Sequence, residues 1–317
     1  MKKKLKILFC SVCILYSINA YTQSDINMST HWYNRANYNP ASIARTDYIY
    51  LFSNARSQWL NVKGAPRTLN IQVSGYNNSI RSAFGLSIVS DNIGVTHTLN
   101  PMFTYAYRIS KSTEWNLTMG LSAGIFTRSI YGSLFESEIP IDPILSYNMD
   151  KTTRPDANFG IEFQSSHYIL GISSTHLFSI SKPSYQFIST NNRYGYAIYK
   201  NNELDIFNFN AGIQLVNRSN IYDLELNTNI RFKRLTGLTS NIHEIFEIGV
   251  SYHTSRQMTI LFGINISQNF KVGYAYDQSF INGYNKNSSH EIMLEYRIPF
   301  NAAASCTQCE KQQNWYQ

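Results

Sequence analysis

Apolar and polar residues alternate along segments of about ten residues or more, and no other feature constrains the fold as strongly. Between Tyr222 and Phe232 the apolar face includes Leu224 and Leu226, and the other face is polar. That polar face consists of Asp223, Glu225, Asn227, Asn229 and Arg231. A period of two predicts a β-strand with two different faces. Strands of this length exceed the usual five or six residues and match the roughly 9–11 needed to cross a bilayer at a tilt.

About 14 segments of this kind lie between residues 48 and 300. We predict an all-β protein, a transmembrane antiparallel β-barrel of about 14 strands with long extracellular loops. An even count suits a bacterial outer-membrane barrel. The sheet must close because every backbone N–H and C=O in lipid needs a partner within the protein. The predicted strands cover residues 48–59, 67–76, 81–90, 97–110, 113–130, 158–166, 167–178, 193–200, 205–217, 222–234, 243–254, 258–267, 270–279 and 289–300.

Two long connections, residues 131–157 and 178–192, interrupt this spacing. Strand parity places the first on the outer side of the membrane. Aromatic residues such as Tyr48, Trp59 and Tyr296 lie near segment ends, as in the interfacial girdles of membrane barrels. A large soluble sandwich or propeller is the alternative architecture, although no repeat of roughly 40–45 residues supports a propeller.

The first twenty residues resemble a secretory signal peptide, with Lys2, Lys3, Lys4 and Lys6 before an apolar stretch. We therefore expect four regions. Residues 1–20 form the signal, with cleavage as late as residue 23; residues 21–47 are an N-terminal periplasmic segment; residues 48–300 are the barrel; and residues 301–317 are a C-terminal periplasmic tail. Beyond the signal no apolar run reaches the roughly 18 residues of a transmembrane helix.

The charge balance argues against a nucleic-acid partner. The formal net charge of +7 includes the four signal lysines, so the remaining chain carries only +3. The short basic run Arg231–Arg234 lies in a predicted strand, where a solvated face is the favoured interpretation over a phosphate site. Nucleic-acid binding by a basic face therefore has little support.

Candidate catalytic and metal-binding motifs are weak. Residues Gly120–Gly124 fit the pattern G-x-S-x-G, but a nucleophile elbow needs a strand that turns into a helix. Ser122 lies mid-strand, so a lumen face of small residues is the simpler interpretation. The seven histidines show no close metal-ligand spacing, and the pairs His243-Glu244 and His290-Glu291 begin predicted strands. We predict no catalytic, cofactor-binding or metal-binding residues, while an outer-membrane hydrolase with a spatially assembled site stays an alternative.

Two cysteines remain after the signal, Cys306 and Cys309. A single C-x-x-C cannot complete a zinc site, and no thioredoxin-like pattern surrounds it. In an oxidising periplasm the two thiols are a candidate disulfide, and a structural or incidental pair is favoured over a redox-active one.

Several stretches resemble the PorP/SprF family of outer-membrane proteins associated with the type IX secretion system. The resemblance begins with Trp32-Tyr33-Asn34 and Tyr38-Asn39-Pro40-Ala41 and continues with Gln58-Trp59, Gly64–Thr68 and Arg154–Gly160. It ends with Gly273–Asp277 and Ser289–Arg297. This chain departs from the family in a reduced opening aromatic run and in its cysteine-containing tail.

The resemblance implies a non-enzymatic outer-membrane component without a cofactor. Its expected partners are the lipid bilayer, other secretion-system subunits and the C-terminal domain of a secreted protein, for example a gliding adhesin, which it would tether or help to export. The alternative function is an outer-membrane channel or transporter for small or hydrophobic molecules.

Overall fold

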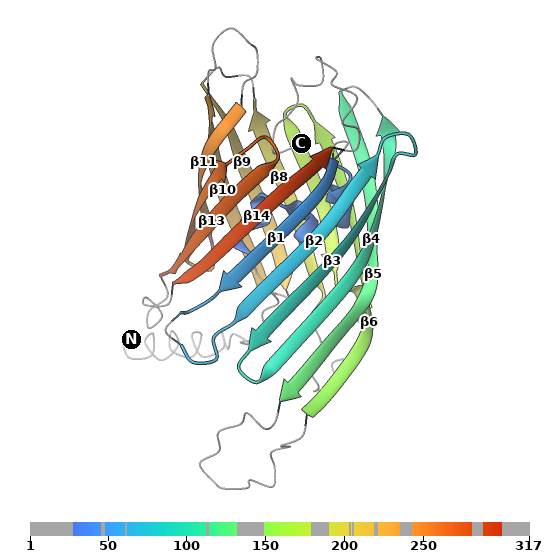
Figure 1. Cartoon of the computed structure of the whole chain (residues 1–317), viewed down its shortest axis with the longest axis vertical. Coiled ribbons are helices and arrows are strands. Elements are labelled where there is room, and N and C mark those ends of the chain that lie inside the picture. Colours follow the sequence, from blue (N-terminus) through green and yellow to red (C-terminus); the bar gives the residue numbers. More distant parts are fainter. Residues whose placement is uncertain are drawn as a thin grey trace, which may run out of the picture.

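The computed structural model describes residues 28–45, 48–60, 62–111, 114–131, 149–178, 190–202, 204, 206–218, 221–234, 243–280 and 288–299. Within them, 14 strands form a closed antiparallel barrel in sequence order (Figure 1). Among these residues no helix is long and apolar enough to cross a membrane. The strands are β1 (Tyr48–Ser57), β2 (Arg67–Asn77), β3 (Ser82–Ile93), β4 (Thr96–Lys111), β5 (Trp115–Tyr131), β6 (Met149–Ser165), β7 (Tyr168–Thr175), β8 (Asn192–Asn201), β9 (Phe207–Arg218), β10 (Ile221–Arg234), β11 (His243–His253), β12 (Gln257–Asn265), β13 (Phe270–Ser279) and β14 (Ser289–Pro299).

The first and last strands close the barrel. β1 pairs with β14 in continuous register from Tyr48 opposite Pro299 to Ser57 opposite His290. This seam satisfies the requirement that a sheet in lipid has no free edge. The predicted all-β barrel of about 14 strands is confirmed.

The two faces of the sheet meet different surroundings, as the alternation predicts. On β10, Leu226 is 52% exposed on the outside of the barrel, whereas its neighbour Asn227 is 6% exposed and faces the lumen. The Asn227 amide donates a hydrogen bond of 2.7 Å to the Ser251 hydroxyl on β11. The inward Asn227 is therefore bonded to a polar residue of the neighbouring strand, and the outward Leu226 is left to contact lipid.

β6 is longer than predicted, because it begins at Met149 and not at residue 158. Pro155 lies inside this strand opposite Ile125 of β5. The ladder with β7 covers only Phe159–Gln164, so the first part of β6 has a paired neighbour on one side alone. Proline has no N–H to donate and is tolerated in such an edge segment. The β5–β6 hairpin consequently projects beyond β7, and its connecting residues 132–148, like residues 179–189, lie outside the described residues.

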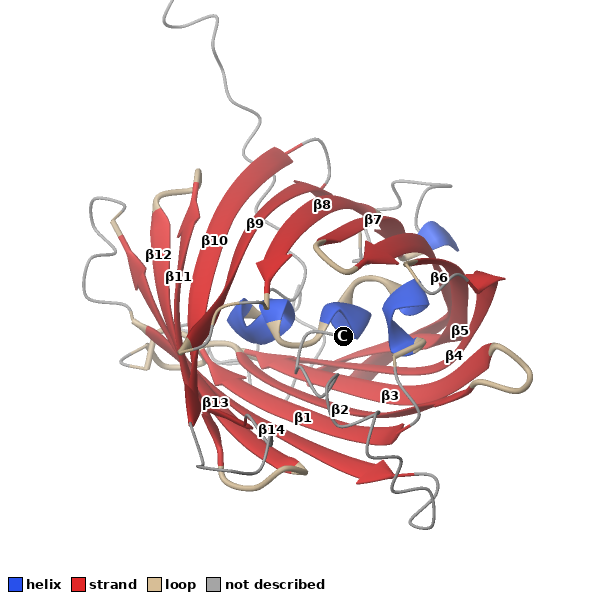
Figure 2. Cartoon of the chain, turned by 90° about the horizontal axis from the view of Figure 1, so that it is seen from above, coloured by secondary structure: helices blue, strands red, loops and turns tan. Residues whose placement is uncertain are grey.

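The segment of residues 21–47, which we expected in the periplasm, lies in the barrel lumen over the part that the structure describes. Its described part, residues 28–45, lies inside the barrel (Figure 2) and is called the plug below. The plug contains three short 3-10 helices, Ser29–Trp32, Arg35–Asn37 and Pro40–Ile43. The Asn34 and Asn39 side chains accept hydrogen bonds from the backbone N–H groups of Ala36 and Ala41, which fixes the second and third turns.

Inward-facing glycines make room for the plug. A Cβ atom on Gly120 would lie 2.4 Å from the Ala41 nitrogen, and one on Gly160 would lie 2.0 Å from Asn39 Oδ1. At Gly212 the Cβ would lie 2.5 Å from the Trp32 ring. These distances are too short for any side chain, so Gly120, the first glycine of the G-x-S-x-G segment, serves close packing of the plug. A Cβ on Gly124, the last residue of that segment, would instead meet Pro101 and Met102 of β4.

The lipid-facing assignment can be tested on β10. Replacing Leu226 with Arg should cost about 2–4 kcal/mol, because a charge near the bilayer midplane is poorly solvated. Tyr222→Arg, on the same outer face but at the strand end, should cost about 0–1 kcal/mol. Denaturant unfolding in lipid vesicles measures both values. Equal penalties would contradict the depth assigned to Leu226.

The glycine contacts give a second test. Gly120→Ala should lower the free energy of unfolding by about 1–3 kcal/mol, because the methyl group overlaps the plug backbone. Gly195→Ala is the matched control, since a Cβ there meets no atom within 4 Å. The same unfolding measurement compares the two variants. A Gly120→Ala protein as stable as the control would show that the plug does not pack against β5.

Candidate functional site

A buried ion pair holds the middle of the plug against the wall. Arg35 Nε lies 2.9 Å from Glu162 Oε2 of β6, and both side chains are buried. The Tyr196 hydroxyl of β8 donates to the same oxygen at 2.5 Å, and the Asn39 amide donates to Tyr196 at 2.7 Å. Plug and wall therefore form one hydrogen-bonded network in which the Glu162 charge is compensated.

A second carboxylate, Glu225 of β10, binds the start of the plug. Trp32 Nε1 donates to Glu225 Oε1 at 2.5 Å, and His31 Nε2 lies 3.0 Å from Oε2. On the wall, His253 of β11 lies between Glu225 and Asp223, at 3.6 Å and 3.1 Å respectively.

The third anchor lies beside the β1–β14 seam. The Ser29 backbone N–H donates to Glu291 of β14 at 2.7 Å, and the Thr30 hydroxyl also bonds to that carboxylate. Arg56 of β1 lies 3.1 Å from Glu291 and 2.5 Å from Asp277 of β13. These contacts place the start of the plug near the rim where β1 and β13 end.

The far end of the plug lies at the opposite rim. Arg45 donates to Asn34 within the plug at 2.8 Å and lies 4.0 Å from Glu295 of β14. Arg108 of β4 donates to the Ala44 carbonyl at 2.6 Å. The plug thus runs from one rim toward the other, and its positive groups meet carboxylates of the wall.

Burial raises the pKa of the Tyr33 and Tyr38 hydroxyls well above their ordinary values, so both stay protonated.

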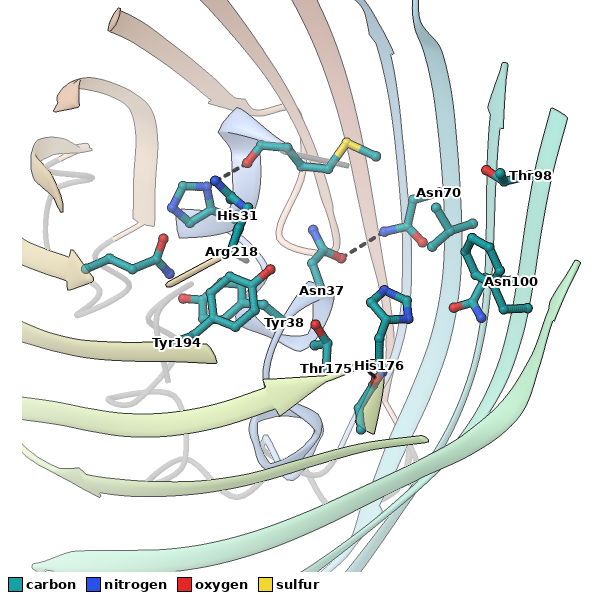
Figure 3. A pocket seen from close by; sticks show the side chains of 15 residues that line it. His31, Asn37, Tyr38, Asn70, Thr98, Asn100, Thr175, His176, Tyr194 and Arg218 are labelled. Carbon is teal, nitrogen blue, oxygen red and sulfur yellow. Dashed lines mark hydrogen bonds between the residues drawn. The ribbon is translucent and has the colours of Figure 1, made fainter. Parts of the chain in front are cut away.

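A cavity of about 100 Å³ separates the plug from the wall formed by β2 to β9 (Figure 3). The cavity lies toward the rim where the odd-numbered strands end, because Thr175 and Arg218 are the last residues of β7 and β9. Most of its lining is polar and uncharged. Wall residues Asn70, Asn100, Asn158 and Gln214 line it together with the plug residues Asn37 and Tyr38.

The structure shows where the candidate catalytic serine, the strand-initial histidines and the basic run lie. Ser122 lies within β5, and its hydroxyl is 2.8 Å from that of Thr104 on β4, without the strand-to-helix turn of a nucleophile elbow. His243 and His290 lie at the starts of β11 and β14, as predicted. Arg231 is wrongly assigned to a solvated face: it is fully buried and lies 3.1 Å from Glu244.

The remaining sequence predictions concern the cysteine pair, metal binding and the segment before the first strand. Cys306 and Cys309 lie outside the described residues, so their pairing stays a prediction. Among the described residues, no group of three or more His, Cys, Asp or Glu side chains could hold a metal ion. The alternation analysis missed the plug because residues 28–45 carry no period of two. The available signal was the density of aromatic and amide residues before the first strand.

Comparison with known proteins extends these observations. The sequence profile described as "Type IX secretion system membrane protein PorP/SprF" matches residues 20–296. No curated protein matches the chain. A FadL homologue from Pseudomonas aeruginosa is a similar solved structure, with 11% identity, a TM-score of 0.48, and 87% of this chain and 95% of that one covered.

Two further structures are similar to about the same degree. The CymD monoaromatic hydrocarbon channel has 12% identity and a TM-score of 0.49, with 86% of this chain and 93% of that one covered. The outer membrane protein Omp33 of Acinetobacter baumannii has 10% identity and a TM-score of 0.46, with 79% and 98% covered.

The profile match includes the plug and extends into β14. A closed barrel that matches a secretion-system membrane protein over this length is located in the outer membrane. The chain belongs to the PorP/SprF family of type IX secretion system membrane proteins.

Proposed function

We propose that this protein is a non-enzymatic outer-membrane component that tethers a secreted protein, or aids its export, through the C-terminal domain of that protein. A gliding adhesin is one type of protein that could be held in this way. The observation that carries the proposal is the plug, whose Arg35 and Trp32 are almost completely buried in the lumen. A barrel filled by its own chain acts through its rims and surfaces more readily than through an open aqueous path.

The strength of the plug contacts supports this interpretation. Arg35 pairs with Glu162, and Trp32 with Glu225, both in positions with almost no solvent access. Breaking a buried pair by removing one partner typically costs about 3–5 kcal/mol, because an uncompensated charge is left behind. Movement of the plug out of the lumen would break several such contacts together.

The projecting β5–β6 hairpin offers a docking surface. Lys151 and Arg154 are exposed on the part of β6 that has no β7 neighbour. Segments held away from a rigid scaffold are common sites of binding. Their positive charges suit an acidic surface on the secreted partner or on another secretion subunit.

Conductance separates tethering from the channel alternative. The wild-type protein in planar bilayers should pass little current, and Arg35→Met should increase the current because the plug loses an anchor and Glu162 loses its partner. Arg231→Met is the matched control, since it removes another fully buried lumen arginine that pairs with the wall residue Glu244. A large steady wild-type conductance, or an equal increase in both variants, would favour a channel.

Affinity purification tests the partner. From mildly solubilised outer membranes, the tagged wild-type barrel should recover a large secreted protein or other secretion subunits. A Lys151→Glu, Arg154→Glu variant should recover several-fold less, because the charge of the hairpin is reversed. Arg67→Glu, at the start of β2 on the same rim, is the control and should recover wild-type amounts. Isolation of the barrel alone under these conditions would contradict the proposal.

A further inference from the structure

The cavity between the plug and the β2–β9 wall is small for a complete ligand. Its volume of about 100 Å³ is below the roughly 300–1,000 Å³ of sites for drug-sized molecules. It therefore fits one side chain of a longer molecule, the rest of which would lie outside. The position of the cavity near the rim of the projecting hairpin places it on the side where a docked partner would be.

Lining residues carry buried polar atoms that have no hydrogen-bond partner among the described residues. On the plug these are Asn37 Nδ2 and the Tyr38 hydroxyl, and on the wall they are Asn70 Oδ1, the Thr175 hydroxyl and Gln214 Nε2. Buried polar groups in native proteins are nearly always paired. Asn37 and Gln214 offer N–H donors, and Asn70 offers a carbonyl acceptor. A carboxamide carries both complementary groups on one short side chain.

The surroundings favour a neutral group over an anion. The two histidines of the lining already lie against carboxylates, His176 at 2.7 Å from Asp156 and His31 at 3.0 Å from Glu225. Arg218, the other basic residue of the lining, also has an interaction with a group of the protein. The basic side chains around the cavity are therefore already engaged within the protein.

The aromatic residues also argue against a sugar. Sugars bind largely by stacking on an aromatic face, but the Tyr38 ring is packed against three others. Its centroid lies 5.2 Å from Tyr194, 5.3 Å from Tyr196 and 5.7 Å from His31. Figure 3 shows Tyr38 and Tyr194 overlapping at one side of the cavity, with Asn37 and Asn70 bonded to each other farther along.

We propose that this cavity receives one Asn or Gln side chain from an extended segment of the secreted partner. This inference rests on the proposed tethering function. The carboxamide oxygen accepts from Asn37 Nδ2 and from the Tyr38 hydroxyl, and its NH2 group donates to Asn70 Oδ1 and to the Thr175 hydroxyl, so its two acceptor and two donor positions are all used. The cavity therefore recognises one side chain of the partner, while the rims of the barrel provide most of the area in contact with that partner.

The first test uses the full-length barrel in lipid nanodiscs and N-acetyl-asparagine methylamide as the probe. Ligand-observed NMR titration should show saturable binding of this compound and of the glutamine analogue. Binding of N-acetyl-leucine methylamide should be at least several-fold weaker. Equal binding of the leucine compound, preferential binding of glucose, or no saturable binding of either amide would overturn the proposal.

Two conservative variants locate the binding. Thr175→Val and Tyr38→Phe each remove one hydroxyl and keep the shape of the side chain. Each should therefore weaken the binding of the asparagine probe by about threefold to tenfold. Thr104→Val and Tyr33→Phe are the matched controls, because these lumen residues do not line the cavity. Equal weakening by the controls would mean that the probe binds elsewhere or responds to a general change in the lumen.

Co-purification separates this inference from the tethering function. The Thr175→Val, Tyr38→Phe double variant should retain several-fold less secreted partner than the Thr104→Val, Tyr33→Phe double variant. Equal retention by both would overturn the cavity inference and leave tethering intact. Failure of the wild-type barrel to retain any secreted protein would instead contradict tethering itself, whatever the probe titration shows.

Discussion

Carboxylates buried in the lumen determine how this barrel is filled. Glu162, Glu225 and Glu291 project inward from three strands and have almost no access to solvent. A buried charge is tolerated only when it is paired and hydrogen-bonded. The plug supplies those partners through Arg35, His31, Trp32 and the backbone at Ser29. The lumen and the plug are therefore complementary parts of one structure, and neither satisfies its polar groups alone.

This complementarity relates the fold to the proposed function. Lipid meets an outer face of residues such as Leu226, while the inner face is occupied by the chain itself. Contacts with other proteins are then left to the rims, where β6 extends past β7. The small polar cavity leaves space between the plug and the wall next to that rim.

Much of the fold follows from the sequence because strand alternation is a local property. The two faces of β10 and β14, including the inward position of Asn227, follow from a period of two. Pro155 misled the prediction of β6, because a proline is acceptable where only one neighbouring strand pairs. The roles of Arg231 and Glu162 were not predictable in this way, since each depends on residues brought close only by barrel closure. The Trp32-Tyr33-Asn34 and Tyr38-Asn39-Pro40-Ala41 stretches carried the family resemblance without showing that they fill the lumen.

The anchoring of Ser29 and Thr30 to Glu291 has a consequence for biogenesis. The earliest described residues of the chain contact its last strand, and Arg56 of the first strand joins the same cluster. A segment held on both sides of a seam is most easily captured while the barrel is still an open sheet, since later entry would require threading through a finished cylinder. The plug is thus suited to act as a template around which the two terminal strands find their register.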